Sequence, residues 1–168
     1  MFIKLFIAVC IVVIAALIGI KKAKAYEERE QIIRESITLF NRVGNDIRYN
    51  LTVLPNAIES ARHGFNTRLR DVLGSISTAI LDNSYSEETV AQEINTLENL
   101  KAYDKQIISQ GIISLGSADA DTQMNLIHGT VATLSELVSE AREEKCKNSK
   151  LYRTVGIVTG LMIAIVIM

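Results

Sequence analysis

The sequence predicts an all-α protein: an antiparallel helical bundle between an N-terminal and a C-terminal transmembrane helix. Three observations support this prediction. Apolar residues recur every three or four positions along the middle of the chain, as they do on one face of a helix. A single proline, together with that spacing, disfavours a β-sandwich. An uncharged apolar run also lies at each end of the 168 residues.

The first apolar run, Leu5–Ile20, contains 16 residues without a charge. As a helix it covers about 24 Å, and Met1–Phe2–Ile3 lengthen it if Lys4 extends its ammonium to the membrane surface. A cleavable signal peptide is the alternative, because Ala23–Lys24–Ala25 resembles a cleavage site. The run is longer than a typical signal core and is followed, not preceded, by its lysines. We therefore expect residues 1–20 to form a retained transmembrane helix.

The second run, Thr154–Met168, contains 15 uncharged residues and covers about 22 Å as a helix. Because a bilayer core is about 30 Å thick, spanning requires local thinning or the help of Leu151 and Tyr152. A buried core helix is the alternative, but the run has no polar face to present to water. We expect residues 151–168 to form a transmembrane helix, and whether it spans fully stays open.

Basic residues border the inner side of both runs. Lys21, Lys22, Lys24 and Arg29 follow the first run, and Lys145, Lys147, Lys150 and Arg153 precede the last. Lysines and arginines next to a transmembrane helix mark its cytoplasmic side. Residues 21–150 are therefore expected to form a cytoplasmic all-helical domain, with both termini across the membrane.

Apolar stripes predict several helices within residues 21–150. The residues expected to face inward are Ile33, Ile37, Phe40, Ile47 and Leu51 in the first helix, Leu69, Val72, Leu73, Ile76 and Ile80 in a later one, and Ile127, Val131, Leu134, Val138 and Ala141 in the last. Thr52 is expected to cap a helix with Pro55 in its first turn. The last helix is expected to run on towards the membrane.

Two further helix starts are expected from capping patterns. Ser86, followed by two glutamates, predicts the start of a helix. Its stripe of Val90, Ile94, Leu97 and Leu100 is expected to carry that helix towards Tyr103, and Ile107–Leu115 continues the pattern. After Gly116, Asp119 is expected to cap the last long helix.

Charge is unevenly distributed, although the whole chain carries only −1. Residues 42–70 have a net charge of +3, and residues 82–144 a net charge of −9. Solvated helix faces are one interpretation; complementary surfaces for self-assembly or a charged partner are the other, with Arg62, Arg68 and Arg70 as candidate partner residues. Nucleic acid is disfavoured as a partner, because aromatic platforms for single strands are missing around these arginines.

The sequence carries few signs of an enzyme. No glycine belongs to a phosphate-binding loop, and His63 and His128 stand far apart without ligand-spaced neighbours. Cys146 lies between two lysines, which can lower a thiol pKa, but no base is placed beside it by sequence. Neither a catalytic residue nor a metal or organic cofactor is expected.

Gly156 and Gly160 form a G-x-x-x-G motif in the last apolar run. Small residues four apart lie on one helical face and allow close helix packing in a membrane. Glycine is also common in transmembrane helices for other reasons, which is the alternative. The motif predicts a helix-packing face.

Three segments resemble the stage III sporulation protein AB family of endospore-forming bacteria. The first is the ending Lys150–Leu151–Tyr152–Arg153–x–x–Gly156–x–x–x–Gly160–Leu161, which runs into an apolar C-terminus. The second is Leu115–Gly116–x–x–Asp119–x–x–x–Gln123–x–x–x–Ile127, and the third is Asp46–Ile47–x–Tyr49–x–x–Thr52–x–Leu54–x–x–Ala57. Two departures occur: Val53 follows Thr52 where the family has proline, and Gly111 is out of step with a family glycine before Leu115.

The resemblance implies a helical domain similar to the F-type platform proteins of type II secretion systems. It implies a non-enzymatic subunit of the channel between mother cell and forespore, in the mother-cell membrane around the forespore. The implied partners are a cytoplasmic ATPase, stage III sporulation protein AA, and the other channel proteins. Shared positions receive structural roles: Tyr49 and Thr52 shape a corner, Gly116 ends a helix, Asp119 caps the next, and Leu115 and Gln123 belong to the same segment.

Two other functional classes stay open at this point. A membrane-anchored sensor with an extracytoplasmic helical bundle is the main alternative, although the basic clusters point inward and nothing follows the last run to transmit a signal. A membrane-bound hydrolase or transferase is the third, because an active site can be assembled from residues scattered in sequence. An oligomer of this chain is also compatible with the sequence.

Overall fold

The computed structural model describes residues 2–116 and 120–167, without the side chains of 2–9, 11, 120, 121, 153, 157, 160, 161, 164, 166 and 167. The described residues form six helices in order: α1 (Phe2–Asn50), α2 (Leu54–Arg62), α3 (Leu69–Leu81), α4 (Glu87–Asn95), α5 (Ala102–Ser114) and α6 (Ala120–Ile167). No strand occurs in these ranges, which confirms the all-α prediction.

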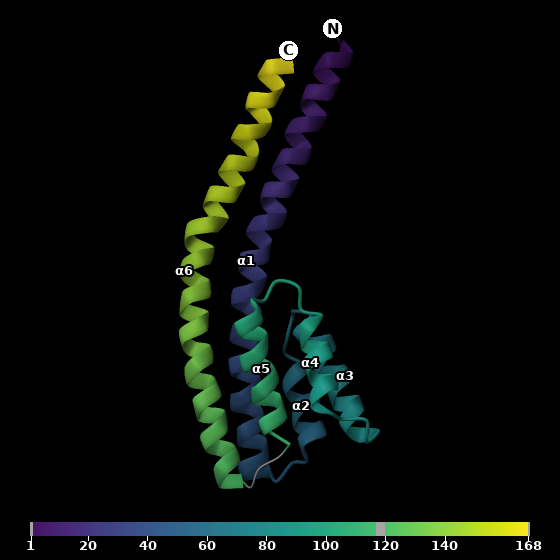
Figure 1. Cartoon of the computed structure of the whole chain (residues 1–168), viewed down its shortest axis with the longest axis vertical. Coiled ribbons are helices and arrows are strands. Elements are labelled where there is room, and N and C mark those ends of the chain that lie inside the picture. Colours follow the sequence, from purple (N-terminus) through teal and green to yellow (C-terminus); the bar gives the residue numbers. More distant parts are fainter. Residues whose placement is uncertain (1, 117–119, 168) are drawn as a thin grey trace. The chain divides into compact units, whose positions relative to one another are not determined.

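The chain divides into two compact units, and both long helices contribute to each. The first unit contains Met1–Glu30 and Glu140–Met168; the second contains Gln31–Ser139. In the second unit, the shorter helices α2 to α5 pack with the later part of α1, and the early part of α6 belongs to the same unit (Figure 1). The last helix continues without a break from the bundle segment to the C-terminal run, as expected.

The core of the second unit is built from the predicted stripes. The fully buried large side chains include Ile33 and Phe40 of α1, Leu69, Leu73 and Ile76 of α3, and Ile94, Ile108 and Ile112 of α4 and α5. Burying one such side chain contributes roughly 1.5–3 kcal/mol to folding. Helix α6 adds Ile127 and Leu134 to the buried set, whereas Val131 and Val138 are half-buried. The helical period therefore predicted most of the core.

The start of α4 follows the predicted cap. The hydroxyl of Ser86 accepts a hydrogen bond from the amide of Thr89 at 3.1 Å. Two glutamates in the first turn lie against the positive end of the helix dipole. The prediction is confirmed because this cap needs only local sequence.

The expectation that this helix continues towards Tyr103 is wrong. Helix α4 ends at Asn95, and α5 begins at Ala102. The stripe residues Leu97 and Leu100 are buried nonetheless, within the connection. Helix α5 starts at a local hydrogen bond: the fully buried Asp104 accepts from the amide of Lys101 at 3.0 Å. Apolar spacing alone does not distinguish a buried connection from a helix.

The corner between α1 and α2 also differs from expectation. Leu51, predicted to face inward, is 86% exposed and has a positive φ of 50°, a conformation that side chains rarely adopt. The N-cap residue of α2 is Val53, not Thr52, and no side chain caps this helix. The amide of Thr52 instead donates to the carbonyl of Asp46 at 3.1 Å, which holds it in the turn. Pro55 does lie in the first turn.

Candidate functional site

Among the described residues, no group of three histidine, cysteine or acidic side chains is arranged to hold a metal ion. His63 lies 3.4 Å from the carboxylate of Glu59, and His128 is exposed on α6. Cys10 is half-buried and Cys146 is exposed, and both are free thiols. The structural features that stand out are instead helix contacts and surfaces.

In the first unit, α1 and α6 approach each other closely at two glycines. A Cβ atom built on Gly19 would lie 2.6 Å from the carbonyl oxygen of Tyr152 and 3.3 Å from the Cα of Gly156. A Cβ atom on Gly156 would lie 2.8 Å from the carbonyl oxygen of Ala15. Gly156 is therefore a helix-contact residue, and its partner is Gly19, which the sequence did not indicate. The surroundings of Gly160 lie outside the described residues.

Large aliphatic side chains are exposed on both helices of this unit. The exposed set includes Val13, Ile14, Leu17 and Ile18 of α1 and Leu151, Val155, Val158, Met162 and Ile165 of α6. Exposed apolar surface of this extent marks an interaction with protein or lipid. Among the described residues, no helix combines the length and hydrophobicity needed to cross a bilayer.

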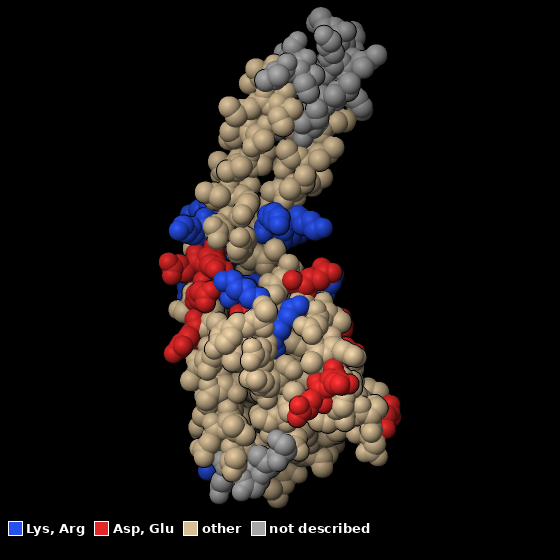
Figure 2. Space-filling model, viewed as in Figure 1, with Lys and Arg blue, Asp and Glu red and all other residues tan. Residues whose placement is uncertain are grey.

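Aromatic and charged residues lie where this apolar surface ends. The rings of Tyr26 and Tyr152 stack with their centroids 5.9 Å apart. Lys21, Lys22 and Lys24 are exposed on α1, as are Lys147 and Lys150 on α6. Figure 2 shows lysine and arginine side chains as a band next to the uncharged surface, with acidic side chains beyond them. This order of residues is typical of a membrane–water boundary.

The shared positions of the second resembling segment meet at the junction of α5 and α6. The side-chain amide of Gln123 donates a hydrogen bond to the carbonyl of Leu115, and both residues are buried. This bond satisfies a carbonyl that the end of α5 leaves without a helical partner. Gly116 lies in the turn after α5. Asp119, the expected cap of α6, lies outside the described residues.

Tyr85 closes the same junction from the side. Its hydroxyl lies 3.5 Å from the carbonyl oxygen of Ile112, and its ring borders Gly116. Burial raises the pKa of the Tyr85 hydroxyl, and the charge of Glu87 raises it further.

This raised pKa predicts a loss of stability in alkali. The protonated hydroxyl is favoured in the fold, so its contribution is complete below the unfolded pKa of about 10 and is lost as pH rises through the higher folded value. The free energy of unfolding should therefore fall more between pH 9 and pH 12 for the native chain than for Tyr85→Phe. Denaturant titrations at both pH values measure the free energy of unfolding. An equal fall in this free energy for the two proteins would contradict the prediction.

Tyr49 and Thr52 do lie at a corner. Tyr49 is 72% exposed, and the guanidinium of Arg48 lies 5.7 Å from the centroid of its ring. With Leu51 and Val53, which are also exposed, it forms an apolar projection between α1 and α2.

The three arginines of the candidate partner surface differ in their surroundings. Arg62 donates twice to the carboxylate of Glu59, both at 2.6 Å, and covers Gly74. This hydrogen-bonded pair lowers the pKa of Glu59. Arg68 and Arg70 are exposed, and Arg68 forms a 3.7 Å ion pair with the carboxylate of Glu98. Charge at this surface is therefore available mainly from Arg68 and Arg70.

Glu35 organises the loop between α2 and α3, a role that sequence reasoning missed. Glu35 is 8% exposed, and its carboxylate accepts hydrogen bonds from the amide of Asn66 at 3.0 Å and from the hydroxyl of Thr67. Gln31 donates a further bond at 3.1 Å. A glutamate on a helix gives no local sign that it will bind a loop 31 residues later.

Replacing Glu35 with alanine is expected to lower the free energy of unfolding by about 3 kcal/mol, because hydrogen bonds to a charged group contribute roughly 1.5–3 kcal/mol each and their donors would be left unpaired. Glu35→Gln keeps an acceptor oxygen and should lose less. Urea denaturation measures both variants. Hydrogen exchange should accelerate at the Asn66 amide in Glu35→Ala, and unchanged exchange there would argue against this role.

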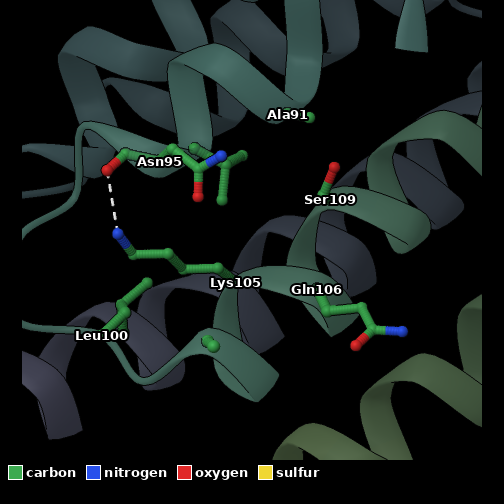
Figure 3. A pocket seen from close by; sticks show the side chains of 8 residues that line it. Ala91, Asn95, Leu100, Lys105, Gln106 and Ser109 are labelled. Carbon is green, nitrogen blue, oxygen red and sulfur yellow. Dashed lines mark hydrogen bonds between the residues drawn. The ribbon is translucent and has the colours of Figure 1, made fainter. Parts of the chain in front are cut away.

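The described residues of the second unit line at least two pockets. One, of about 280 Å³, is lined by residues of α4, α5 and their connection, and Lys105 extends across it to donate a 2.8 Å hydrogen bond to the carbonyl of Asn95 (Figure 3). The bond places a positive charge at the C-terminal end of α4, where the helix dipole favours it. The other, of about 310 Å³, lies between α5 and α6 beside Gly111 and Gly129. Neither contains a cluster of groups arranged for catalysis.

Comparison with known proteins adds a family to this description. The family model described as stage III sporulation protein AB matches residues 4–168. The chain is also similar to stage III sporulation protein AB of Bacillus subtilis (strain 168), with 25% identity over 170 residues, covering 98% of this chain and 99% of that protein. No solved structure matches. The resemblance inferred from the three segments is confirmed.

Proposed function

Because the chain belongs to the stage III sporulation protein AB family and so has a role in sporulation, we propose that it is a membrane platform subunit of the channel between mother cell and forespore. In this proposal it has no enzymatic activity. It links a cytoplasmic ATPase, stage III sporulation protein AA, to the channel proteins assembled beyond the membrane. It resides in the mother-cell membrane around the forespore, with residues 21–150 in the cytoplasm.

The observation that carries the membrane part of the proposal is the boundary at Tyr26 and Tyr152. On one side of this pair lie exposed aliphatic side chains and the uncharged runs Leu5–Ile20 and Thr154–Met168. Lys21, Lys22 and Lys24 lie between the first run and Tyr26, and the acidic residues of both helices lie on the other side of the pair. Transfer of such a helix pair from water to lipid is favourable by about 25 cal/mol for each Å² of apolar surface. The contact between Gly19 and Gly156 supports pairing of the two helices there.

The arrangement of charge supports a cytoplasmic bundle. Except for Lys4, the basic residues that flank the two runs lie on the side of residues 21–150. Such a bias sets the orientation of membrane proteins. A bundle in the cytoplasm can contact an ATPase directly, and the exposed Arg68 and Arg70 offer a basic surface for an acidic partner.

Thiol labelling tests the orientation. In a Cys10→Ser background, vegetative cells that express the full chain are treated with a membrane-impermeant thiol reagent. Because Cys146 is exposed, it is expected to react only after the cells are permeabilised. A Cys10→Ser/Cys146→Ser variant with a cysteine added after Met168 is the matched control and should react in intact cells. Reaction of Cys146 in intact cells would place the bundle outside and support a sensor instead.

Co-purification tests the partner. Stage III sporulation protein AA is expected to co-purify with the full chain from detergent-solubilised membranes, and Arg68→Glu/Arg70→Glu should reduce the recovery. Arg48→Glu, which changes an exposed arginine elsewhere, is the control and should leave recovery unchanged. Equal recovery with all three proteins would exclude this basic surface as the contact.

A further inference from the structure

Two sets of basic residues in the first unit differ in their partners. The first set is neutralised within the protein. Arg29 is 3% exposed and lies 2.7 Å from the carboxylate of Glu144 and 3.7 Å from that of Glu140. Lys145 lies 3.1 Å from the carboxylate of Glu30.

The second set consists of Lys21, Lys22, Lys24, Lys147 and Lys150, here called the lysine collar. All five are exposed. The ion pairs described above join Glu140 and Glu144 to Arg29 and Glu30 to Lys145, so these three carboxylates are partly neutralised by the first set. Five exposed ammonium groups of one sign can therefore attract an external anion.

The collar forms one belt because two contacts fix the register of the helices. Gly19 lies opposite Gly156, and Tyr26 lies opposite Tyr152. At 1.5 Å per residue, the three lysines of α1 lie about 3–8 Å from the tyrosine pair on the apolar side, and the two of α6 lie about 3–8 Å away on the other side. The collar therefore spans about 15 Å along the helices, centred on the tyrosine pair, and the outermost lysines reach a polar interface about 5–8 Å thick by extending their side chains along the helix surface.

We propose that the lysine collar binds the phosphate groups of anionic phospholipids. This inference rests on the proposed membrane location and adds a lipid preference to it. The anion is taken to be a lipid headgroup because the collar borders exposed aliphatic side chains such as Leu17, Ile18 and Val155. A lipid satisfies both surfaces at once, with its phosphate at the ammonium groups and its acyl chains against the aliphatic side chains.

Native mass spectrometry of the delipidated full chain in detergent tests the preference. Phosphatidylglycerol and phosphatidylcholine with identical acyl chains are the probes. The native chain is expected to bind phosphatidylglycerol at least about tenfold more tightly, since each lysine near such a surface contributes about fivefold and more than one lysine can contact a headgroup. Lys21→Gln/Lys22→Gln/Lys24→Gln should bring the two affinities close together, and Lys147→Gln/Lys150→Gln should have a smaller effect in the same direction.

A matched triple variant tests whether position or only total charge matters. Arg34→Gln/Arg48→Gln/Arg142→Gln also removes three exposed positive charges, but outside the collar. It should keep the native preference, as should an arginine version of all five collar positions. An equal loss of preference in the control triple, or no preference in the native chain, would overturn the inference.

Flotation with vesicles of pure phosphatidylcholine separates this inference from the proposed membrane location. The native chain and the collar variants should float equally well, because the apolar surface inserts without anionic lipid. Flotation without a preference for phosphatidylglycerol would overturn the lipid inference and leave the membrane location standing. Failure to float with vesicles of either lipid would overturn both.

Discussion

Replacing Gly111 with valine is expected to destabilise the second unit by about 3 kcal/mol, and Gly111→Ala by less. A Cβ atom at this position would lie 2.5 Å from Cζ of Phe40 and 2.8 Å from Cγ2 of Thr130. Overpacking of a filled core costs about 1–3 kcal/mol, while alanine recovers about 1 kcal/mol through its higher helix propensity. Urea denaturation followed by circular dichroism measures the change.

Gly129 provides the matched control for this prediction. It lies on α6, and a Cβ atom built there meets nothing within 4 Å. Gly129→Ala should therefore raise the free energy of unfolding by about 0.5–1 kcal/mol. Phe40→Leu, although destabilising by itself, should reduce the cost of Gly111→Ala because it removes the ring atoms that clash. Equal stability of the two alanine variants would contradict the close contact at Gly111.

The buried helix faces could be predicted because they depend on period alone. Leu69, Leu73 and Ile76 occupy one face of α3, and all three are buried. The cap at Ser86 could also be predicted, because its hydroxyl and the amide of Thr89 that donates to it are only three residues apart. Helix faces and helix starts could therefore be predicted from neighbouring residues where no contact with a distant part of the chain determines the structure.

The spacing of apolar residues predicted the wrong secondary structure where a buried connection joins two helices. Leu97 and Leu100 keep the spacing of a helix, but they lie between α4 and α5. Their burial comes from the surrounding helices, and a buried leucine looks the same in sequence whether it lies in a helix or in a loop. The prediction that Leu51 is buried was also wrong, because a turn with positive φ ends α1 before the apolar stripe is complete.

The features of the candidate site that were missed all require knowledge of a distant partner. The family motif identified Leu115 and Gln123, but not the hydrogen bond that joins them. The spacing of Gly156 and Gly160 indicated a packing face, whereas the contact with Gly19 depends on the register of two helices at opposite ends of the chain. The partners of Glu35 are 31 and 32 residues away. Sequence patterns report local periods, and these contacts are set by tertiary packing.

Gly19→Val and Gly156→Val are expected to separate the two terminal helices. The nearest atom to the added Cβ is a backbone carbonyl oxygen in each case, at 2.6 Å for Gly19 and 2.8 Å for Gly156. A side chain can move away by changing its rotamer, but a helical backbone moves only if the whole helix shifts. Overpacking of about 1–3 kcal/mol would lower the population of the close pair on the order of tenfold.

Cross-linking measures this separation in membranes. Tyr26→Cys and Tyr152→Cys replace the stacked rings in a Cys10→Ser/Cys146→Ser background, and a short bifunctional thiol reagent joins them when the helices are close. Val155→Leu, at a neighbouring residue that is 50% exposed, is the control and should not change the yield. If both valine variants cross-linked as well as this control, α1 and α6 would not depend on the glycine contact. A loss confined to the glycine variants would show that the absence of two side chains sets the distance between these helices.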